Sequence, residues 1–218
     1  MINWEKIDTV LLDMDGTLLD LNFDNHFWQE FVPLTYAKQR GHSLTEAKTL
    51  LAPQFKKMEG QLEWYCLDYW SEALQLDIVG LKMEIAGLIA VLPHVVDFLE
   101  AIHQSSRTVL LVTNAHRNSL GLKMDKTCLN RFFDALISSH DYGYAKEHPA
   151  FWPLLQQQHP FDKQRTLLID DSLAVLTAAR QFGLEQLISI SKPDSKRPKR
   201  VIEDFSAIED FRELMKGL

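Results

Sequence analysis

The sequence lacks the features that would assign it to a membrane, a disulfide-stabilised fold or a nucleic-acid complex. Its 218 residues include two cysteines, Cys66 and Cys128, which are too few for a disulfide framework. No apolar run reaches the roughly 18 residues needed to span a bilayer. The N-terminal stretch MINWEKIDTV also lacks the charged-then-apolar pattern of a secretion signal. Lys and Arg total 23 against 30 Asp and Glu, a net charge of −7, so general attraction to nucleic acid or an anionic membrane is not expected. We therefore expect a cytoplasmic protein with neither of these partners.

Apolar residues are plentiful, at 46% of the chain, so a folded core is expected. Five short segments are almost continuously apolar, which is typical of strands buried on both faces of a parallel sheet. They are residues 9–13, 108–112, 135–138, 166–170 and 186–190. Helical patterns follow between most of them, at residues 93–104, 118–126, 149–158 and 172–182. This alternation predicts an α/β fold with a doubly wound, Rossmann-like parallel sheet.

The connection between the first two strands is far longer than a crossover needs. Residues 21–91, called the insertion below, carry no strand pattern and predict three helices over residues 24–39, 43–57 and 61–76. Ser43 and Glu46 form a capping-box pattern at the start of the second helix. We expect the insertion to be a separate helical domain, and residues 1–20 and 92–218 to form the α/β core.

Carboxylates stand at the ends of two predicted strands. Asp13 and Asp15 follow the first strand, with Gly16 permitting a tight turn, and Asp170 and Asp171 follow the fourth. The carboxyl ends of parallel strands meet at one edge of the sheet, where ligands bind in such folds. Converging carboxylates repel one another unless a cation neutralises them. An all-oxygen site of this kind fits Mg²⁺ best.

The other strand ends carry groups suited to an anion. Thr113 and Asn114 end the second strand before a predicted helix, whose free N–H groups favour an anion. Lys146 follows the third strand and is the cation that can balance the aspartates. Each group alone also has an ordinary explanation, since Thr and Asn often cap helices and lysines are usually solvated. Their combination is what suggests a site.

Taken together, these motifs resemble those of the haloacid dehalogenase-like (HAD) hydrolase family. The resemblance is carried in order by Asp13-Met-Asp15-Gly16-Thr17, Thr113-Asn114, Lys146 and Asp170-Asp171-Ser172. It covers the roughly 150 residues outside the insertion, and it implies that the insertion is a helical cap. Because dehalogenases of this family lack the second aspartate, Asp15 favours phosphoryl chemistry.

The resemblance also implies roles for these residues. Asp13 would attack phosphorus and form an aspartyl-phosphate, and Asp15 would act as general acid and then as general base. Thr113 and Asn114 would bind the phosphoryl oxygens, and Lys146 would bridge the nucleophile and the phosphate.

Magnesium is the cofactor that the resemblance implies. Its ligands would be Asp13, the backbone carbonyl of Asp15, and Asp171, with Asp170 as a further ligand or an outer-shell anchor.

Two positions depart from the usual family pattern. The lysine is often followed by proline, but Glu147 and His148 separate Lys146 from Pro149. The fourth motif often has another acid four residues on, where this chain has Val175. The chain therefore resembles the family variant with two adjacent aspartates, in which Asp170 is expected to do more of the work.

The insertion suggests the substrate. Residues 23–70 hold 10 of the 22 aromatic residues, among them Trp28, Trp64, Tyr65, Tyr69 and Trp70; these suit either base stacking or the insertion's own core. Asn22, Asn25 and His26 also follow the first motif closely enough to enter the site. The stretches around Phe23–Trp28 and Trp64–Ser71 resemble bacterial purine 5′-nucleotidases of the family, which implies GMP and IMP as small-molecule substrates.

Other functions stay open at this point. A sugar-phosphate phosphatase or phosphoglucomutase would use the same chemistry, and a non-catalytic protein that binds a phosphorylated ligand would use the same fold. The sequence carries no signature of an oligomer interface.

Overall fold

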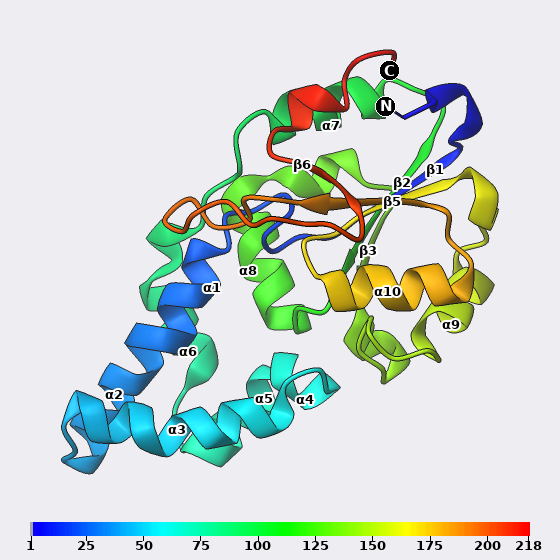
Figure 1. Cartoon of the computed structure of the whole chain (residues 1–218). Coiled ribbons are helices and arrows are strands. Elements are labelled where there is room, and N and C mark those ends of the chain that lie inside the picture. The colour runs from blue at the N-terminus through cyan, green and yellow to red at the C-terminus, as the bar shows by residue number, and fades with distance from the viewer. Residues whose placement is uncertain (1) are drawn as a thin grey trace.

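The computed structural model describes residues 2–218 and contains a six-stranded sheet in which all neighbouring strands pair in parallel (Figure 1). The strand order is β3-β2-β1-β4-β5-β6. The strands are β1 (Thr9–Leu12), β2 (Thr108–Thr113), β3 (Ala135–Ser138), β4 (Thr166–Ile169), β5 (Gln186–Ile190) and β6 (Ser206–Ile208). The five predicted strands are therefore confirmed. Strand β6 was not predicted, because its three residues include two exposed ones and form no apolar run.

Helices cover both faces of the sheet, as expected for a doubly wound fold. They are α7 (Val95–His103), α8 (Arg117–Thr127), α9 (Phe151–Gln158) and α10 (Leu173–Phe182). Successive side chains of a strand point to opposite faces. Val10 and Leu12 accordingly pack in the cluster that contains α7 and α8, whereas Leu11 packs in the cluster that contains α9 and α10. Burial on both sides explains why these strands are continuously apolar.

The two ends of the chain meet beside the sheet. The short helices η1 (Trp4–Lys6) and η7 (Phe211–Glu213) lie near α7, and the ring of Phe98 in α7 lies 6.3 Å from Trp4 and 5.0 Å from Phe211. The indole Nε1 of Trp4 donates a hydrogen bond of 2.9 Å to the carbonyl of Leu214. Both ends therefore lie on the side where β1 begins, opposite its carboxyl end (Figure 1).

All secondary-structure elements of the insertion are helices or helical turns, and residues 21–91 contain no strand. Its helices are α1 (Asn22–His26), α2 (Val32–Arg40), α3 (Leu44–Met58), α4 (Leu62–Tyr65), α5 (Leu67–Leu74) and α6 (Ile78–Glu84), with a π-helical turn η2 (Phe27–Phe31) and a 3₁₀ turn η3 (Ala86–Leu88). The predicted capping box of Ser43 and Glu46 is confirmed at the start of α3. The third predicted helix is interrupted at Cys66, whose backbone is extended, and α6 was not predicted.

The insertion has a hydrophobic core of its own, which much of its aromatic content serves. Trp70 is 1% exposed, and its ring makes edge contacts with Phe55 at 5.1 Å and Tyr69 at 5.0 Å. Phe27 and Leu51 are fully buried in the same cluster. The division of the chain into an α/β core and a separate helical domain stays a prediction.

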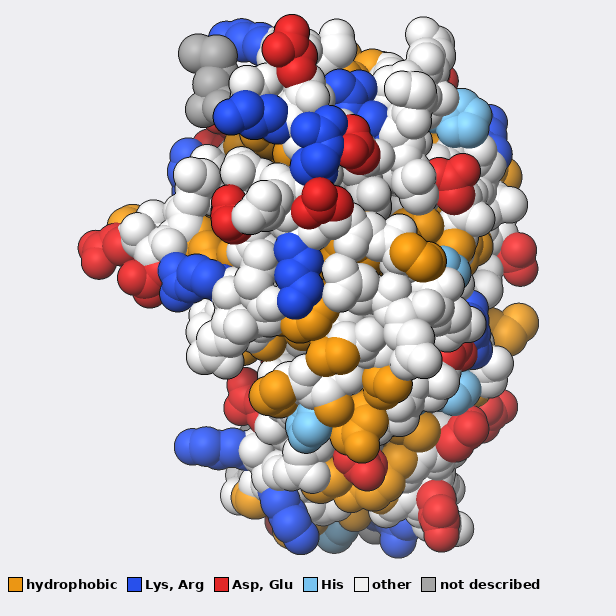
Figure 2. All heavy atoms as spheres, turned by 90° about the vertical axis from the view of Figure 1, so that its right-hand side faces the viewer, with side chains coloured by type: hydrophobic (Ala, Val, Ile, Leu, Met, Phe, Trp, Pro, Cys, Tyr) orange, Lys and Arg blue, Asp and Glu red, His pale blue; other side chains and the backbone are white. Residues whose placement is uncertain are grey.

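The remaining short elements connect these layers. They are η4 (Leu129–Phe132), η5 (Ser139–Tyr142) and η6 (Lys163–Arg165). Across residues 2–218, no helix combines the length and the apolar character that crossing a membrane requires. On the face drawn in Figure 2, acidic and basic side chains are interspersed, and hydrophobic side chains gather in the lower half. This face therefore carries no extended field of one charge.

Candidate active site

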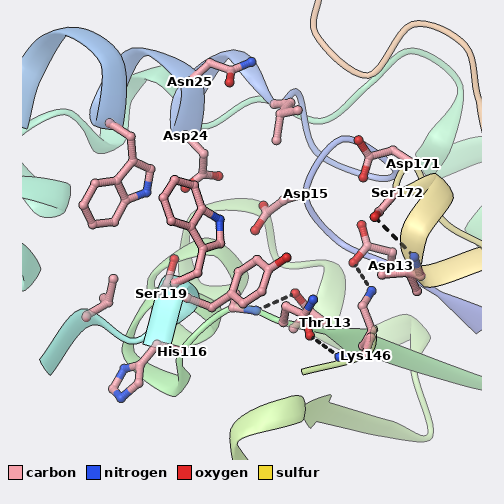
Figure 3. Close-up of a pocket in the computed structure, with 18 of the residues that line it drawn as sticks. Asp13, Asp15, Asp24, Asn25, Thr113, His116, Ser119, Lys146, Asp171 and Ser172 are labelled. Atoms are coloured by element: carbon pink, nitrogen blue, oxygen red, sulfur yellow. Dashed lines mark hydrogen bonds and ion pairs between the residues drawn. The ribbon is translucent and has the colours of Figure 1, made fainter. Parts of the chain in front are cut away.

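A cavity of about 320 Å³ lies between the carboxyl edge of the sheet and the insertion (Figure 3). Asp13, Thr113 and Asp170 line it from the ends of β1, β2 and β4. Because these three strands are neighbours in the sheet, their ends bring together side chains that are up to 157 positions apart in the sequence. The size is within the range of small-molecule sites, roughly 300–1,000 Å³.

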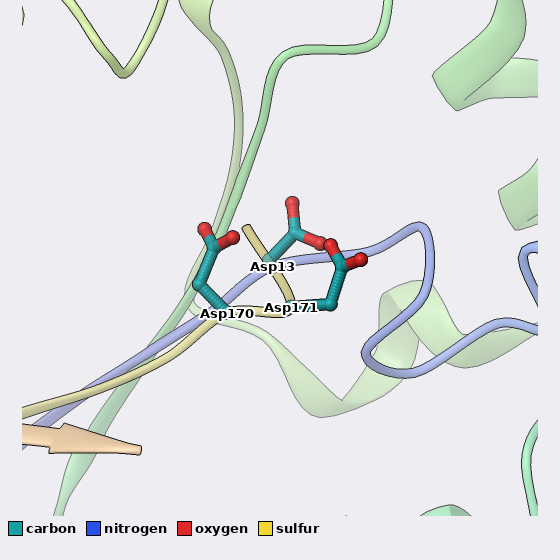
Figure 4. A group of neighbouring side chains, drawn as sticks. All are labelled: Asp13, Asp170 and Asp171. Carbon is teal, nitrogen blue, oxygen red and sulfur yellow. The ribbon is translucent and has the colours of Figure 1, made fainter. Parts of the chain in front are cut away.

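Three carboxylates gather at the cavity floor (Figure 4). One oxygen from each of Asp13, Asp170 and Asp171 lies within 4.8 Å of the others. Gly16 allows this approach, because its φ is +83° and a Cβ there would lie 2.7 Å from the Asp171 carboxyl carbon. Any side chain at this position would therefore push Asp171 out of the cluster.

The charge of this cluster is not balanced by the nearby cations. Burial and the negative charges of neighbouring aspartates raise the pKa of Asp171 well above its usual value and that of Asp170 to about 7. Lys146 contacts two of the carboxylates, and Arg200 lies 3.8 Å from Asp171. An oxygen-only donor set with excess negative charge fits a hard divalent cation. These residues therefore fit the magnesium ion expected from the sequence.

Lys146 is buried and holds the nucleophile candidate in place. Its Nζ donates hydrogen bonds to Asp13 at 2.6 Å, to Asp170 at 2.7 Å and to the carbonyl of Val112 at 2.9 Å. Burial would lower the pKa of Lys146, but the two carboxylates outweigh it and raise the pKa above its usual value. The lysine therefore stays charged beside Asp13, although Glu147 stands where proline was expected.

Asp15 points away from the three-carboxylate cluster. Its carboxylate accepts a 2.7 Å bond from Lys123, a buried residue of α8, and lines the same cavity. Burial raises the pKa of Asp15 to about 6, against the lowering effect of Lys123. A carboxyl group that titrates near neutral pH can both give and take a proton.

A chain of buried charges continues from Asp15 into the insertion. Lys123 also donates to Asp24 in α1 at 2.6 Å, and Asp24 accepts a second bond of 2.6 Å from Lys82 in α6. Lys82 Nζ lies 4.6 Å from the ring centre of Phe27, a cation–π contact. Asp15, Lys123, Asp24 and Lys82, called the charge chain below, thus join the sheet edge to two helices of the insertion.

Sequence reasoning missed Asp24, Lys82 and Lys123. Lysines in helices are usually solvated, so neither lysine was singled out. For Lys123 the available signal was position, because it follows the apolar Leu120 by three residues and so lies on the buried face of a predicted helix. Lys82 gave no such signal, because α6 was not predicted. A buried lysine needs an acidic partner, which could have directed attention to Asp24.

Thr113 and Asn114 both line the cavity, where they were expected to bind phosphate. The Thr113 hydroxyl accepts a bond of 3.0 Å from the Ala115 amide. The Asn114 side chain accepts a bond of 2.8 Å from the Lys146 backbone N–H and donates one of 2.8 Å to Glu147. Its amide is therefore fixed beside Lys146.

The insertion forms the opposite wall of the cavity, which is largely aromatic. Trp28, Phe55, Trp64 and Tyr65 line it, and the rings of Trp28 and Trp64 stack at 6.5 Å with an interplanar angle of 27°. Tyr69 instead packs on Trp70 in the insertion's core. The aromatic content therefore serves both the wall and the core.

Of the three polar residues considered near the first motif, Asn25 lines the cavity. Its amide donates a bond of 2.6 Å to Asp194 in the loop after β5, which fixes the start of the insertion against that loop. Asn22 and His26 do not line the cavity, and His26 is exposed at the end of α1. The loop after β5 therefore contacts the insertion directly.

Comparison with known proteins agrees with the motifs. A family model described as haloacid dehalogenase-like hydrolase matches residues 7–183. The chain is 41% identical over 217 residues to the GMP/IMP nucleotidase YrfG of Escherichia coli, covering 100% of this chain and 98% of that protein. It is also 23% identical over 210 residues to a phosphoglycolate phosphatase of Agrobacterium fabrum, covering 91% of this chain and 89% of that one.

A solved structure has the same fold. The HAD phosphatase from Thermococcus onnurineus superposes with a TM-score of 0.79 at 21% identity, over 96% of this chain and 97% of that one. Together these matches confirm the family resemblance and the fold class inferred from the sequence.

Proposed function

This chain belongs to the haloacid dehalogenase-like hydrolase family, and we propose that it hydrolyses purine 5′-mononucleotides such as GMP and IMP with the help of Mg²⁺. The observation that carries the proposal is the position of Asp13, held by Lys146 on the floor of a cavity whose opposite wall is aromatic. A phosphate at the floor and a purine at the wall would fill the two chemically different ends of the cavity. The 41% identity to a GMP/IMP nucleotidase supports this choice of substrate.

The first step is proposed to transfer the phosphoryl group to Asp13. A carboxylate oxygen of Asp13 forms the new O–P bond while the bond from phosphorus to the nucleoside 5′-oxygen breaks. Asp15 gives its proton to that oxygen, which leaves as an alcohol. The raised pKa of Asp15, about 6, supports this role because about a tenth of the carboxyl groups are then protonated at pH 7, far more than at the ordinary pKa of an aspartate.

The second step is proposed to release phosphate. Asp15, now a carboxylate, takes a proton from water as the water oxygen bonds to phosphorus, and the bond between phosphorus and Asp13 breaks. Lys146 stays hydrogen-bonded to Asp13 and reduces the repulsion between this carboxylate and the phosphate dianion. Thr113 and Asn114 are proposed to orient the phosphoryl oxygens.

Asp13, Asp170, Asp171 and the backbone carbonyl of Asp15 are the proposed magnesium ligands. A bound Mg²⁺ would stabilise negative charge on the phosphoryl oxygens. The raised pKa values of Asp170 and Asp171 support a site that a further cation would stabilise. We propose a cytoplasmic location, which suits an enzyme of intracellular nucleotides.

The test is a panel of phosphate esters assayed for phosphate release with Mg²⁺ present. GMP and IMP should be turned over with the highest kcat/KM. A preference for hexose phosphates or phosphoglycolate would overturn the substrate assignment, and conversion of one hexose phosphate to another would indicate a mutase. If every ester is inert while phosphate still binds, the protein is a non-catalytic binding protein.

A further inference from the structure

Glu147 is the residue that departs from the family pattern after the lysine, and it makes a specific pair of contacts. Its Oε1 accepts a bond of 2.7 Å from the hydroxyl of Tyr65, and its Oε2 accepts one of 2.8 Å from the side-chain amide of Asn114. Tyr65 belongs to α4 of the insertion, and Asn114 follows β2. One carboxylate therefore joins the wall of the cavity to its floor.

Both contacts have the geometry and charge of strong hydrogen bonds. Burial and the negative charge of Glu147 raise the pKa of Tyr65 well above 10, so its hydroxyl keeps its proton and acts as the donor at neutral pH. Hydrogen bonds to an ionised carboxylate are roughly twice as strong as those between neutral groups. The hydrogen bond from Tyr65 to Glu147 therefore holds α4 against the core in addition to side-chain packing.

The floor side of this connection reaches the proposed phosphate site. Asn114 accepts a bond of 2.8 Å from the Lys146 backbone N–H, and Trp152 Nε1 donates one of 2.9 Å to the Lys146 carbonyl. Asn114 and the backbone of Lys146 are thus held as one unit, with Glu147 fixing the amide orientation. On the wall side, Tyr65 directly follows Trp64, whose ring stacks on Trp28.

We propose that Glu147 is a positioning residue that couples the seating of the aromatic wall, through Tyr65, to the orientation of Asn114 at the phosphate. With the wall seated, a substrate meets both ends of the cavity at once. Without the hydrogen bond from Tyr65, α4 moves away from the core more often, and the fraction of molecules able to bind substrate falls. The inference rests on the proposed function for the nucleotide used as the probe and for the phosphate placed beside Asn114.

The kinetic test uses Tyr65→Phe, which removes one hydroxyl, and Glu147→Gln, which replaces an acceptor by a donor. A lower fraction of binding-competent molecules raises the apparent dissociation constant by the same factor. We expect KM for GMP to rise by roughly tenfold in each variant, the size of one charged hydrogen bond, with kcat within about twofold of wild type. The double variant should be no worse than the more affected single variant, because both changes break the same contact.

Two variants of the same region serve as controls. Tyr69→Phe removes a hydroxyl from a tyrosine of α5 that packs in the insertion's core, and Glu63→Gln neutralises an exposed carboxylate two residues before Tyr65. Both should have wild-type KM and kcat. A reduction of kcat with unchanged KM in Tyr65→Phe or Glu147→Gln, or fully additive losses in the double variant, would overturn the coupling.

A second readout needs no substrate. Amide hydrogen exchange in residues 62–67 of the ligand-free protein should be faster in Tyr65→Phe and Glu147→Gln than in wild type and in the controls; unchanged exchange would also overturn the proposal. If wild type turns over another ester but not GMP, the proposed substrate fails alone. The same variants are then assayed with that ester, and the exchange experiment still decides the role of Glu147.

Discussion

Replacing Lys123 by methionine tests the charge chain directly. Lys123 is 1% exposed and lies 2.7 Å from Asp15 and 2.6 Å from Asp24. Two unit charges 2.7 Å apart attract by about 6 kcal/mol at an effective dielectric constant of about 20, much of which offsets the cost of burying them. Asp24 keeps Lys82 as a partner, so Asp15 is the group left without compensation.

Removing one partner of a buried ion pair typically costs about 3–5 kcal/mol, and we expect Lys123→Met to lower the free energy of unfolding by this amount at pH 8. The loss should be smaller at pH 5. Lys123 lowers the pKa of Asp15, so the variant's Asp15 titrates above the wild-type value of about 6 and is protonated, hence neutral, at pH 5. As the pH rises through that pKa, the uncompensated charge forms and stability is lost.

The measurement is urea denaturation of the metal-free protein at both pH values. Lys126→Met, on the exposed side of the same helix, should change stability by less than about 0.5 kcal/mol. The double variant Lys123→Met/Asp15→Asn should recover part of the loss, since no unpaired charge remains. A loss below about 1 kcal/mol at pH 8, or equal losses at pH 5 and pH 8, would refute the view that Lys123 compensates Asp15.

The other predictions concern the reaction and its pH dependence. Asp13→Asn should release no phosphate from GMP while its circular dichroism matches wild type, and retained turnover would remove Asp13 as the nucleophile. EDTA should abolish phosphate release and added Mg²⁺ restore it, whereas turnover that persists in EDTA would contradict the carboxylate site. Trp28→Ala should raise KM for GMP more than KM for glycerol phosphate. Equal changes in the two KM values would mean that the aromatic wall does not recognise the base. In metal-free wild type, the free energy of unfolding should fall from pH 4.5 to pH 7. The raised pKa values of Asp15 (about 6) and Asp170 (about 7) mean that the folded state binds protons more tightly than the unfolded state, so stability is lost as these groups ionise. Burial lowers the pKa of His140, which contributes in the opposite direction, but the two aspartates outweigh it. A rise over this range in urea titrations would contradict those shifts.

Most of the sheet could be predicted because each central strand is apolar on both faces. The same reasoning located Asp13, Thr113 and Asp170, since residues at the ends of neighbouring parallel strands must share one edge. Lys146 was also found by its place after a strand, and the structure puts its Nζ 2.6 Å from Asp13. In these cases the position of a residue directly after an apolar strand is enough to place it at the carboxyl edge of the sheet.

The remaining site residues depend on how the insertion packs on the core, and sequence periodicity does not reveal that. Asp24 and Lys123 are 99 positions apart and meet only because α1 lies against α8. Tyr65 and Glu147 are 82 positions apart and meet across the cavity. Their partners could not be read from spacing, because each pair joins a residue of the insertion to a residue outside it.

The contact between Trp4 and Leu214 has a practical consequence for handling the protein. Because both chain ends lie beside the amino-terminal end of β1, a resin, a surface or a fluorescent fusion attached at either end would leave the mouth of the cavity open to diffusing substrate. The same closeness suits circular permutation: a short Gly-Ser peptide could join the ends, with new termini cut at an exposed turn such as that after Gly41.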